Sequence, residues 1–506
     1  MSAEPRAESG GFSHREVLRI LSGVLLGMML AALDQTVVAT ALPAIAGELG
    51  GLEHLAWIVA GYLVTSTATT PIYGKLSDLY GRRRLLEIAI LLFVAASLLC
   101  GLAQTMGQLV AARALQGLGG GGLISMAQAI IADVIAPRER GRYQAYLSGV
   151  WATASVGGPV LGGVLVDHLS WRWVFWINLP VGIAAFLLCR RALRALPVPH
   201  QRRRIDYLGA ALLILCVVDL LLIASWGGGT YAWESTTMLG LIAAAPPLIV
   251  AFLLQELRAS EPILPPRLLG HRVIRVANLA SFIVAMAMFG AVVLLPVFLQ
   301  LVTGVSAGNS GALLIPLMSG TVVGASTSGQ LMRRTGRYKA VPLVGLALST
   351  LAFALLATMS AATTPVLAMV YMGILGIGIG STMPVMLVAA QNAADGRDIG
   401  TATATVAFFR SLGGSFGAAI LWSIFLAVLA RALAGTGGDL GLSLLRGGPD
   451  AAAQLPAAER AVLVPALVHA FRLVFAIAAG LTALGGIVTW FLPELPLRST
   501  TAPAKN

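Results

Sequence analysis

The stretch "GMMLAALDQTVVATALP", residues 27–43, carries a single carboxylate in the middle of a long apolar run. Between Arg19 and Glu48 the only ionisable side chain is that of Asp34. A run of roughly 20 mostly apolar residues can span a bilayer as a helix. A charge near the middle of a bilayer costs at least ~2.5–3.5 kcal/mol, so an acid placed there is a candidate functional residue. This stretch therefore predicts both a membrane-spanning fold and a site inside it.

The composition extends this prediction to the whole chain. Of the 506 residues 57% are hydrophobic and only 11% are charged, whereas a soluble domain has about 25% charged residues. The sequence therefore predicts an all-α polytopic membrane protein. Fourteen apolar segments of spanning length follow one another, at residues 20–43, 54–73, 85–105, 108–132, 143–166, 171–189, 206–226, 236–255, 276–301, 309–331, 340–361, 364–390, 400–430 and 466–492.

The basic residues predict which side of the membrane each loop faces. Most of the 34 Lys and Arg residues lie in the two tails and in every second loop. Loops rich in Lys and Arg stay in the cytoplasm, so the tails at 1–19 and 493–506 are predicted to be cytoplasmic and the membrane to be the plasma (inner) membrane. The net charge of +12 then reports topology and contact with anionic membrane lipid, and no nucleic-acid partner is expected.

Two loops repeat a pattern of glycines and basic residues. "GKLSDLYGRRR" at 74–84 and "GQLMRRTGRYK" at 329–339 both have G-x-L, a second glycine and then a basic run, at an offset of 255 residues. This repetition predicts two related six-helix halves, 20–190 and 275–492, separated by two inserted helices in 206–256. Such halves, packed around a cavity near the midplane, are typical of secondary transporters.

Arg113 is the predicted partner of Asp34. At 1.5 Å per residue, Asp34 lies about 21 Å from the inner end of a ~30 Å span, and Arg113 lies at a matching depth. The pair is either a structural salt bridge or a proton-linked switch, and we predict the switch. Gln116 lies on the same helix face as Arg113. The residues predicted to line a substrate cavity are Gln35, Gln116, Asp219 and Arg410.

The energy source is predicted to be a proton gradient, with no cofactor. The chain has no G-x-x-x-x-G-K-[ST] motif, which argues against an ATP-driven pump encoded on this chain alone. The three cysteines, Cys100, Cys189 and Cys216, fall inside predicted spans, and the six histidines show no metal-ligand spacing. We therefore expect no metal site and no enzymatic activity.

Six ordered motifs give the chain a family resemblance. They are "LDQTVVATALPAI" in the first segment, "GKLSDLYGRRR" in the first inner loop, "ARALQGLGGGG" in the fourth segment, "GGPVLGG" in the fifth, "WRWVFWINLPVG" entering the sixth and "FFRSLGGSFG" in the thirteenth. In these motifs the chain resembles the major facilitator superfamily, and specifically its fourteen-spanner drug:proton antiporter branch (QacA/EmrB-like). One departure is Ala154, where the fifth-segment motif usually has glycine.

The resemblance implies a gating latch at the first inner loop. Its residues are Gly74, Asp78, Gly81 and Arg82, with Asp133 nearby. From the residues themselves, Gly74 and Gly81 predict a tight turn, and Asp78 and Arg82 can pair with neighbouring helix ends. The alternative is a loop whose charges only set topology. In the second half Arg333 stands where Asp78 stands, so the latch there is predicted to be degenerate.

The fifth segment carries the residues of the antiporter motif. They are Gly157, Gly158, Pro159, Gly162 and Gly163. Small residues let helices approach closely in lipid, and proline removes a backbone donor. Packing explains the pattern by itself, and the resemblance adds that this contact seals a gate.

Together these features predict a proton-coupled multidrug efflux antiporter that exports small amphiphilic compounds by alternating access. A lipid exporter or a dedicated antibiotic exporter of the same fold is the alternative, because the interior offers few acids for cationic drugs. A receptor or a channel is disfavoured, since neither needs both paired halves and a buried proton switch. The expected partners are the small amphiphilic substrates, protons and membrane lipid. In a cell with two membranes, the resemblance also implies an adaptor protein and an outer-membrane duct.

Overall fold

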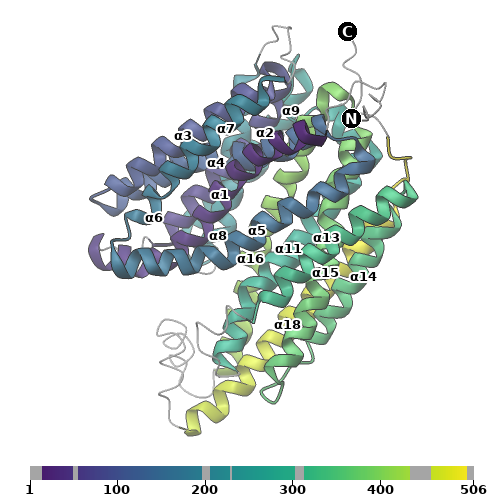
Figure 1. Ribbon diagram of the computed structural model, residues 1–506. Helices are drawn as coiled ribbons and strands as arrows, with labels where there is room; N and C mark the ends of the chain where they lie inside the picture. The colour runs from purple at the N-terminus through teal and green to yellow at the C-terminus, as the bar shows by residue number, and fades with distance from the viewer. Residues whose placement is uncertain are drawn as a thin grey trace, which may run out of the picture.

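The computed structural model describes residues 14–49, 55–195, 205–227, 231–302, 313–433 and 457–498. Over these ranges the chain is helical apart from its connections, and the one β contact is an isolated bridge between Gly227 and Tyr231. The all-α fold predicted from the composition is confirmed (Figure 1).

The helices that precede residue 196 pack into a first group. An apolar core that includes the fully buried Leu30, Phe93 and Ile130 lies between them. The members of this group are α1 (His14–Leu49), α2 (Leu55–Tyr80), α3 (Arg82–Leu102), α4 (Met106–Val134), α5 (Pro137–His168), α6 (Trp173–Trp176), α7 (Asn178–Ala192) and the short 3₁₀ turn η2 (Leu193–Ala195).

The helices that follow residue 271 pack into a second group. Aromatic rings fill its core, and among them Phe471 contacts both Phe298 and Phe425. The members are α11 (Arg272–Leu301), α13 (Ile315–Thr335), α14 (Ala340–Leu356), α15 (Pro365–Ala393), the 3₁₀ turn η3 (Gly396–Asp398), α16 (Ile399–Leu433) and α18 (Ala457–Trp490).

Two long helices and one short helix lie between the groups in sequence. α8 (Tyr207–Trp226) and α9 (Thr236–Arg258) pack against each other, and α8 also contacts α2 and α16. α10 (Pro266–Gly270) leads into α11. α8 and α9 coincide with the predicted segments at 206–226 and 236–255.

Eleven of the described helices are long and apolar enough to cross a membrane. Each of the fourteen predicted segments overlaps a described helix, but α2 and α13 are not among the eleven, and α14 is shorter. In α2 the polar residues Ser66, Thr67, Thr69 and Thr70 are buried inside the protein and lower the apolar character of the helix. The chain is therefore a multi-pass membrane protein, and the number fourteen stays a prediction.

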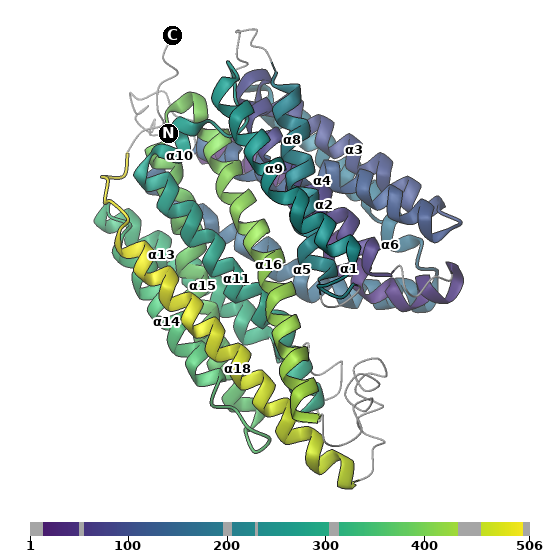
Figure 2. The same ribbon diagram turned by 180° about the vertical axis from the view of Figure 1, so that it is seen from behind.

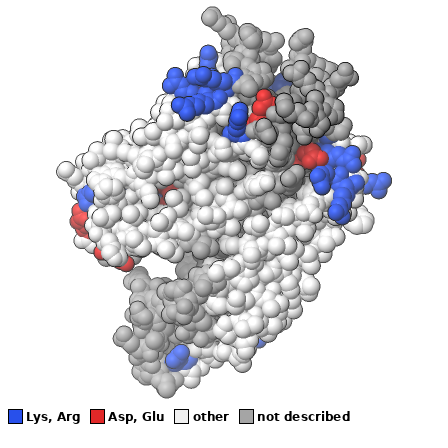
Figure 3. Space-filling model, viewed as in Figure 1, with Lys and Arg blue, Asp and Glu red and all other residues white. Residues whose placement is uncertain are grey.

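The two groups touch at one end of the molecule and diverge toward the other (Figures 1 and 2). The contacts between them run mainly from α2 to α16 and from α5 to α13. We call the end where the groups touch the closed end and the opposite end the open end. α1 begins and α18 ends at the closed end. Figure 3 shows most of the visible Lys and Arg gathered there.

Candidate functional site

Asp34 and Arg113 form a buried ion pair between α1 and α4. Nη1 of Arg113 lies 2.6 Å from Oδ2 of Asp34, and the two residues are 1% and 2% exposed. This contact confirms the matching depths predicted from the sequence. Removing one partner of such a pair leaves an uncompensated buried charge, so each charge depends on the other. Their part in moving protons stays a prediction.

Three neutral side chains complete the surroundings of the Asp34 carboxylate. Nε2 of Gln116 and Nδ2 of Asn178 donate to Oδ1, at 2.9 and 2.8 Å. The same two nitrogens donate to Oγ of Ser97, at 2.7 and 3.4 Å. All three side chains are buried. We call these five residues the Asp34 cluster; in it the carboxylate meets only donors, which is what an ionised carboxylate needs.

The guanidinium of Arg113 is also held by α2. Its Nε donates to the carbonyl oxygen of Ile58 at 3.2 Å, and its Cζ lies 4.4 Å from the centre of the Tyr62 ring. Glycines on α4 allow this approach, because a Cβ at Gly117 would lie 2.4 Å from the carbonyl oxygen of Tyr62. The ion pair therefore sits where α1, α2, α4 and α7 meet.

At the closed end, Asp78 of α2 caps the first turn of α16. Its Oδ1 accepts from the backbone N–H of Gly400 at 3.0 Å, and its Oδ2 accepts from the N–H and the hydroxyl of Thr401, both at 2.7 Å. Free N–H groups and the helix dipole favour a carboxylate at a helix N-terminus. The predicted pairing of Asp78 with a neighbouring helix end is confirmed, and it joins the two helix groups.

Arg82 links this cap to α4. Its Nη2 lies 2.6 Å from Oδ1 of Asp78, and its Nε donates to Oδ2 of Asp133 at 2.7 Å. A third nitrogen, Nη1, donates to Ser77. Asp133 is thus the neighbour that the resemblance implied. We call Asp78, Arg82 and Asp133, with the start of α16, the α2–α16 latch.

Gly74 and Gly81, the two glycines predicted to belong to the latch, have different roles. Gly81 has φ +90°, which favours glycine, and separates α2 from α3 as predicted. Gly74 does not lie in a turn, which corrects the prediction. It lies within α2, where a Cβ would come 2.3 Å from Cβ of Ala404 and 2.9 Å from the carbonyl oxygen of Gly400. Its lack of a side chain therefore lets α2 and α16 touch.

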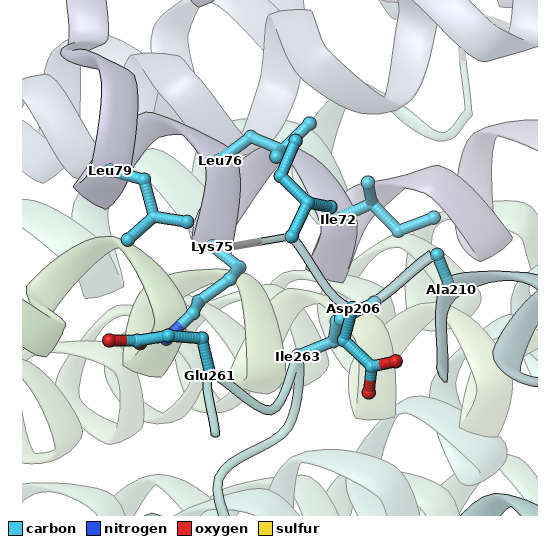
Figure 4. A pocket seen from close by; sticks show the side chains of 9 residues that line it. Ile72, Lys75, Leu76, Leu79, Asp206, Ala210, Glu261 and Ile263 are labelled. Carbon is cyan, nitrogen blue, oxygen red and sulfur yellow. The ribbon is translucent and has the colours of Figure 1, made fainter. Parts of the chain in front are cut away.

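The segment between α9 and α11 contacts both helices of the latch. Nζ of Lys75, on α2, lies 2.7 Å from Oε2 of Glu261. Nη2 of Arg267, on α10, lies 2.9 Å from Oδ1 of Asp398, just before α16. Figure 4 shows Lys75 and Glu261 beside a cavity of about 10 Å³, which has room for about one water molecule. Neither ion pair was predicted from the sequence.

The second contact at the closed end, between α5 and α13, has a different chemistry. Nε of Arg138 donates to the backbone carbonyl oxygen of Arg333 at 2.9 Å. Arg140, also on α5, donates through Nη1 to Oε1 of Gln391 on α15 at 3.3 Å. Arg333 stands in the second group at the position that Asp78 has in the first. It contributes its backbone carbonyl to this contact. The contact between α5 and α13 therefore has no acid at the position that matches Asp78, as the prediction of a degenerate latch requires.

Part of the antiporter motif packs α5 against α1. A Cβ at Gly158 would lie 2.0 Å from Oγ1 of Thr36, and one at Gly162 would lie 2.1 Å from Oγ1 of Thr40. By contrast, a Cβ at Gly157 or Gly163 would meet nothing within 4 Å. The prediction of close contact therefore holds for two of the four glycines. Pro159, between them on α5, is exposed.

At the open end, Glu48 ties the end of α1 to α6. Its carboxylate accepts from Nη1 of Arg172 at 2.5 Å and from Nε1 of Trp171 at 2.7 Å. These hydrogen bonds, chiefly the one from Arg172, lower the pKa of Glu48. The contact gives "WRWVFWINLPVG" a structural role, since its first residues fix α6 against α1.

The predicted cavity residues lie on four different helices, α1, α4, α8 and α16. Gln35 is partly buried beside Asp34, whereas Gln116 is fully buried within the Asp34 cluster. Asp219, on α8, is buried, and its Oδ2 has no hydrogen-bond partner among the described residues. Arg410, on α16, is partly buried and is not paired with an acid in the described ranges.

Sequence reasoning missed Ser97, Asn178 and Tyr62. Each is a polar side chain inside a predicted span, and the burial of such a side chain requires a hydrogen-bond partner. Asn178 even stands within a motif quoted for the resemblance, "WRWVFWINLPVG". Only the packing of α1, α3, α4 and α7 reveals that Asp34 is the partner of Asn178.

Known transport proteins are similar to this chain. The family model described as Major Facilitator Superfamily matches residues 24–418. An uncharacterized MFS-type transporter of Mycobacterium tuberculosis is 41% identical over 480 residues, which cover 94% of this chain and 70% of the relative. The multidrug transporter protein MdtP of Bacillus subtilis is 36% identical over 527 residues, with 98% and 96% covered.

Solved structures support the fold alone. The human organic anion transporter MFSD10 superposes with a TM-score of 0.63 at 15% sequence identity. The superposition covers 94% of this chain and 99% of that one.

Proposed function

The chain belongs to the major facilitator superfamily, and we propose that it is a proton-coupled antiporter that exports small amphiphilic compounds. Members of the family are transporters rather than enzymes. The finer assignment, to proton-driven efflux, rests on the Asp34 cluster and on the latch.

The buried ion pair of Asp34 and Arg113 is the observation that carries the proposal. Both side chains are almost fully buried, and they come from helices long and apolar enough to cross a membrane. Ionisable residues inside a membrane are rare and mark proton relays or transport pathways. A carboxylate that is opened to one side at a time can take up a proton outside and release it inside.

Alternating access is supported by the shape of the molecule. The two groups are joined at the closed end by the α2–α16 latch and diverge at the open end. Both described chain ends and most Lys and Arg visible in Figure 3 lie at the closed end. With both termini in the cytoplasm of a cell bounded by a plasma (inner) membrane, this is the outward-facing state. The predicted halves, 20–190 and 275–492, would rock against each other to reach the inward-facing state.

A proton gradient is sufficient to drive such export. Each proton that moves inward yields ~2.3 kcal/mol per 100 mV, which supports roughly a 50-fold substrate gradient. The chain carries no nucleotide-binding P-loop motif. In a double-membrane cell, an adaptor protein and an outer-membrane duct would complete the path.

The substrate class is proposed from the relatives and from the charges in the interior. MdtP is named a multidrug transporter, which favours several small amphiphilic substrates over one. The alternative is a lipid exporter or a dedicated antibiotic exporter. It is favoured because the interior has few acids that could bind cationic drugs. Asp219 and Arg410 have no ion-pair partner among the described residues, and they lie on separate helices, α8 and α16.

Transport by the purified wild-type protein in proteoliposomes tests the proposal. The measurement is the uptake of a fluorescent amphiphilic cation, a neutral antibiotic and a labelled lipid against their gradients, with an imposed pH difference. We expect uphill uptake of the amphiphiles that disappears when a protonophore collapses the pH difference. Uphill uptake that survives the protonophore would contradict proton coupling. Uptake of the lipid alone would select the alternative.

A further inference from the structure

Asn178 differs from the other residues of the Asp34 cluster in having an unused acceptor. Its Nδ2 donates to Asp34 at 2.8 Å and to Ser97 at 3.4 Å. Its Oδ1 is buried and has no hydrogen-bond partner within the described residues. A buried polar atom without a partner costs about 1–3 kcal/mol, so a structure that keeps one calls for a reason.

The other members of the Asp34 cluster have no free acceptor to offer. Arg113 can only donate. Oε1 of Gln116 already accepts from Nη1 of Arg113 and lies 3.7 Å from Sγ of Cys100. Oγ of Ser97 accepts from two amides and donates to the carbonyl oxygen of Phe93 at 2.8 Å. Asn178 is therefore the member of the cluster that can supply an acceptor to Asp34.

A coupling carboxyl needs different neighbours in its two protonation states. The ionised form only accepts, whereas the protonated form also donates through its O–H. A half-turn of the Asn178 amide about its Cβ–Cγ bond would bring Oδ1 to the place of Nδ2, where it could accept from the acid of Asp34. One amide atom is left without a partner before and after this turn.

We propose that Asn178 is a positioning residue that serves both protonation states of Asp34, as a donor to the carboxylate and as an acceptor for the acid. This inference rests on the proposed function, because it assumes that Asp34 takes up and releases protons. Asn178 is the first residue of α7. The inference therefore links this helix to the protonation state of Asp34.

The other ionisable groups at this site have ordinary pKa values outside the range from pH 5 to pH 8. Arg113 from α4 pairs with Asp34, Tyr62 from α2 lies against Arg113, and Cys100 from α3 lies against Gln116. The ionisable residues of α5 and α7 lie toward the ends of these helices, and α6 has none. A change between pH 5 and pH 8 therefore leaves the charges of these neighbours unchanged.

Asn178→Leu is the decisive variant, because leucine is similar in size and neither donates nor accepts. If Asn178 serves both states, each state loses one hydrogen bond. Uphill transport should then slow about tenfold, which equals about 1.4 kcal/mol, while the pH of half-maximal transport moves by less than about 0.3 unit. If Asn178 is only a donor, the ionised form alone is weakened, and the midpoint should rise by about one unit. That rise, or an unchanged rate, would overturn the inference.

Asn278→Leu is the matched control. Asn278, on α11 in the second group, is also buried, and neither of its amide atoms has a partner in the described ranges. Its replacement should leave both the rate and the pH midpoint within about twofold and about 0.3 unit of wild type.

A measurement on the wild type keeps the inference testable if Asn178→Leu fails to reach the membrane. Infrared difference spectra between pH 8 and pH 5 should contain a carboxylic-acid band, missing in Asp34→Asn, together with a shift of an asparagine side-chain carbonyl band. The acid band without the amide shift would overturn the inference. The proposed function fails separately, if Asp34→Asn itself pumps uphill with a normal pH response.

Discussion

The two helix groups differ most in the residues at matching positions. Asp78 of the first group is matched by Arg333 of the second. Arg113, the eighth residue of α4, is matched by Met372, the eighth residue of α15. At the closed end the first group supplies charged side chains, and the second supplies backbone groups and neutral side chains. Asp78 binds the N–H groups of α16, and Arg138 binds the carbonyl oxygen of Arg333. The repeat has thus kept the helical framework while concentrating the charges in one half. Backbone groups cannot titrate, so the proposed proton chemistry belongs to the first group.

The largest effect is expected from Arg113→Leu. It leaves the Asp34 carboxylate buried without its counter-charge, which destabilises a protein by about 3–5 kcal/mol. The measurement is thermal unfolding of the purified protein in detergent, with uphill transport assayed alongside. The double variant Asp34→Asn/Arg113→Leu removes both charges and should recover most of the stability but no uphill transport. A double variant as unstable as the single one would show that the charge balance is not what matters.

An intermediate effect is expected from Asp78→Asn. It removes the charge that caps α16, and a hydrogen bond to a charged group is worth about 1.5–3 kcal/mol. The closed end should open more often, so a cysteine at Thr405, which is buried on α16, should react about tenfold faster with a reagent from the closed side. The protein should still reach the membrane.

Arg333→Ala is the matching change in the second group. Because Arg333 contributes its backbone carbonyl, which alanine keeps, the reactivity of the same cysteine should stay unchanged. Equal reactivity in the Asp78 and Arg333 variants would erase the difference between the two contacts and return the first loop to a signal of topology.

The smallest effect is expected within the first group, between two neighbouring glycines. Gly158→Ala forces a Cβ to within 2.0 Å of Oγ1 of Thr36, and overpacking of this kind typically costs about 1–3 kcal/mol. Gly157→Ala meets nothing within 4 Å and should leave the melting temperature unchanged or slightly raised. If the two variants melt at the same temperature, α5 does not pack on α1 through Gly158.

The features of the site that could be predicted from the sequence are those that follow from the geometry of a single helix. The rise per residue placed Asp34 and Arg113 at matching depths, and ionisable side chains inside an apolar run tend to pair with one another. The bond from Asp78 to a helix end was also predictable, because an acid within a basic loop works against the topology signal.

The features that were predicted wrongly or not at all depend on which helices pack against each other. Gly74 looked like a turn residue, since the sequence does not show that α2 continues past it and touches α16. Ser97 and Asn178 carry no charge, so nothing in their own segments points to Asp34. The two ion pairs of the segment after α9 join residues more than a hundred positions apart, and one sequence alone gives no sign of such pairs.

Transport by Asp34→Asn tests the central claim most directly. Asparagine keeps the shape of the side chain and removes only its titration. In proteoliposomes, the variant should still exchange labelled for unlabelled substrate down a gradient, but it should not accumulate substrate when a pH difference is imposed. Accumulation at the wild-type level, with the wild-type dependence on pH, would contradict this mechanism and place proton coupling elsewhere in the molecule.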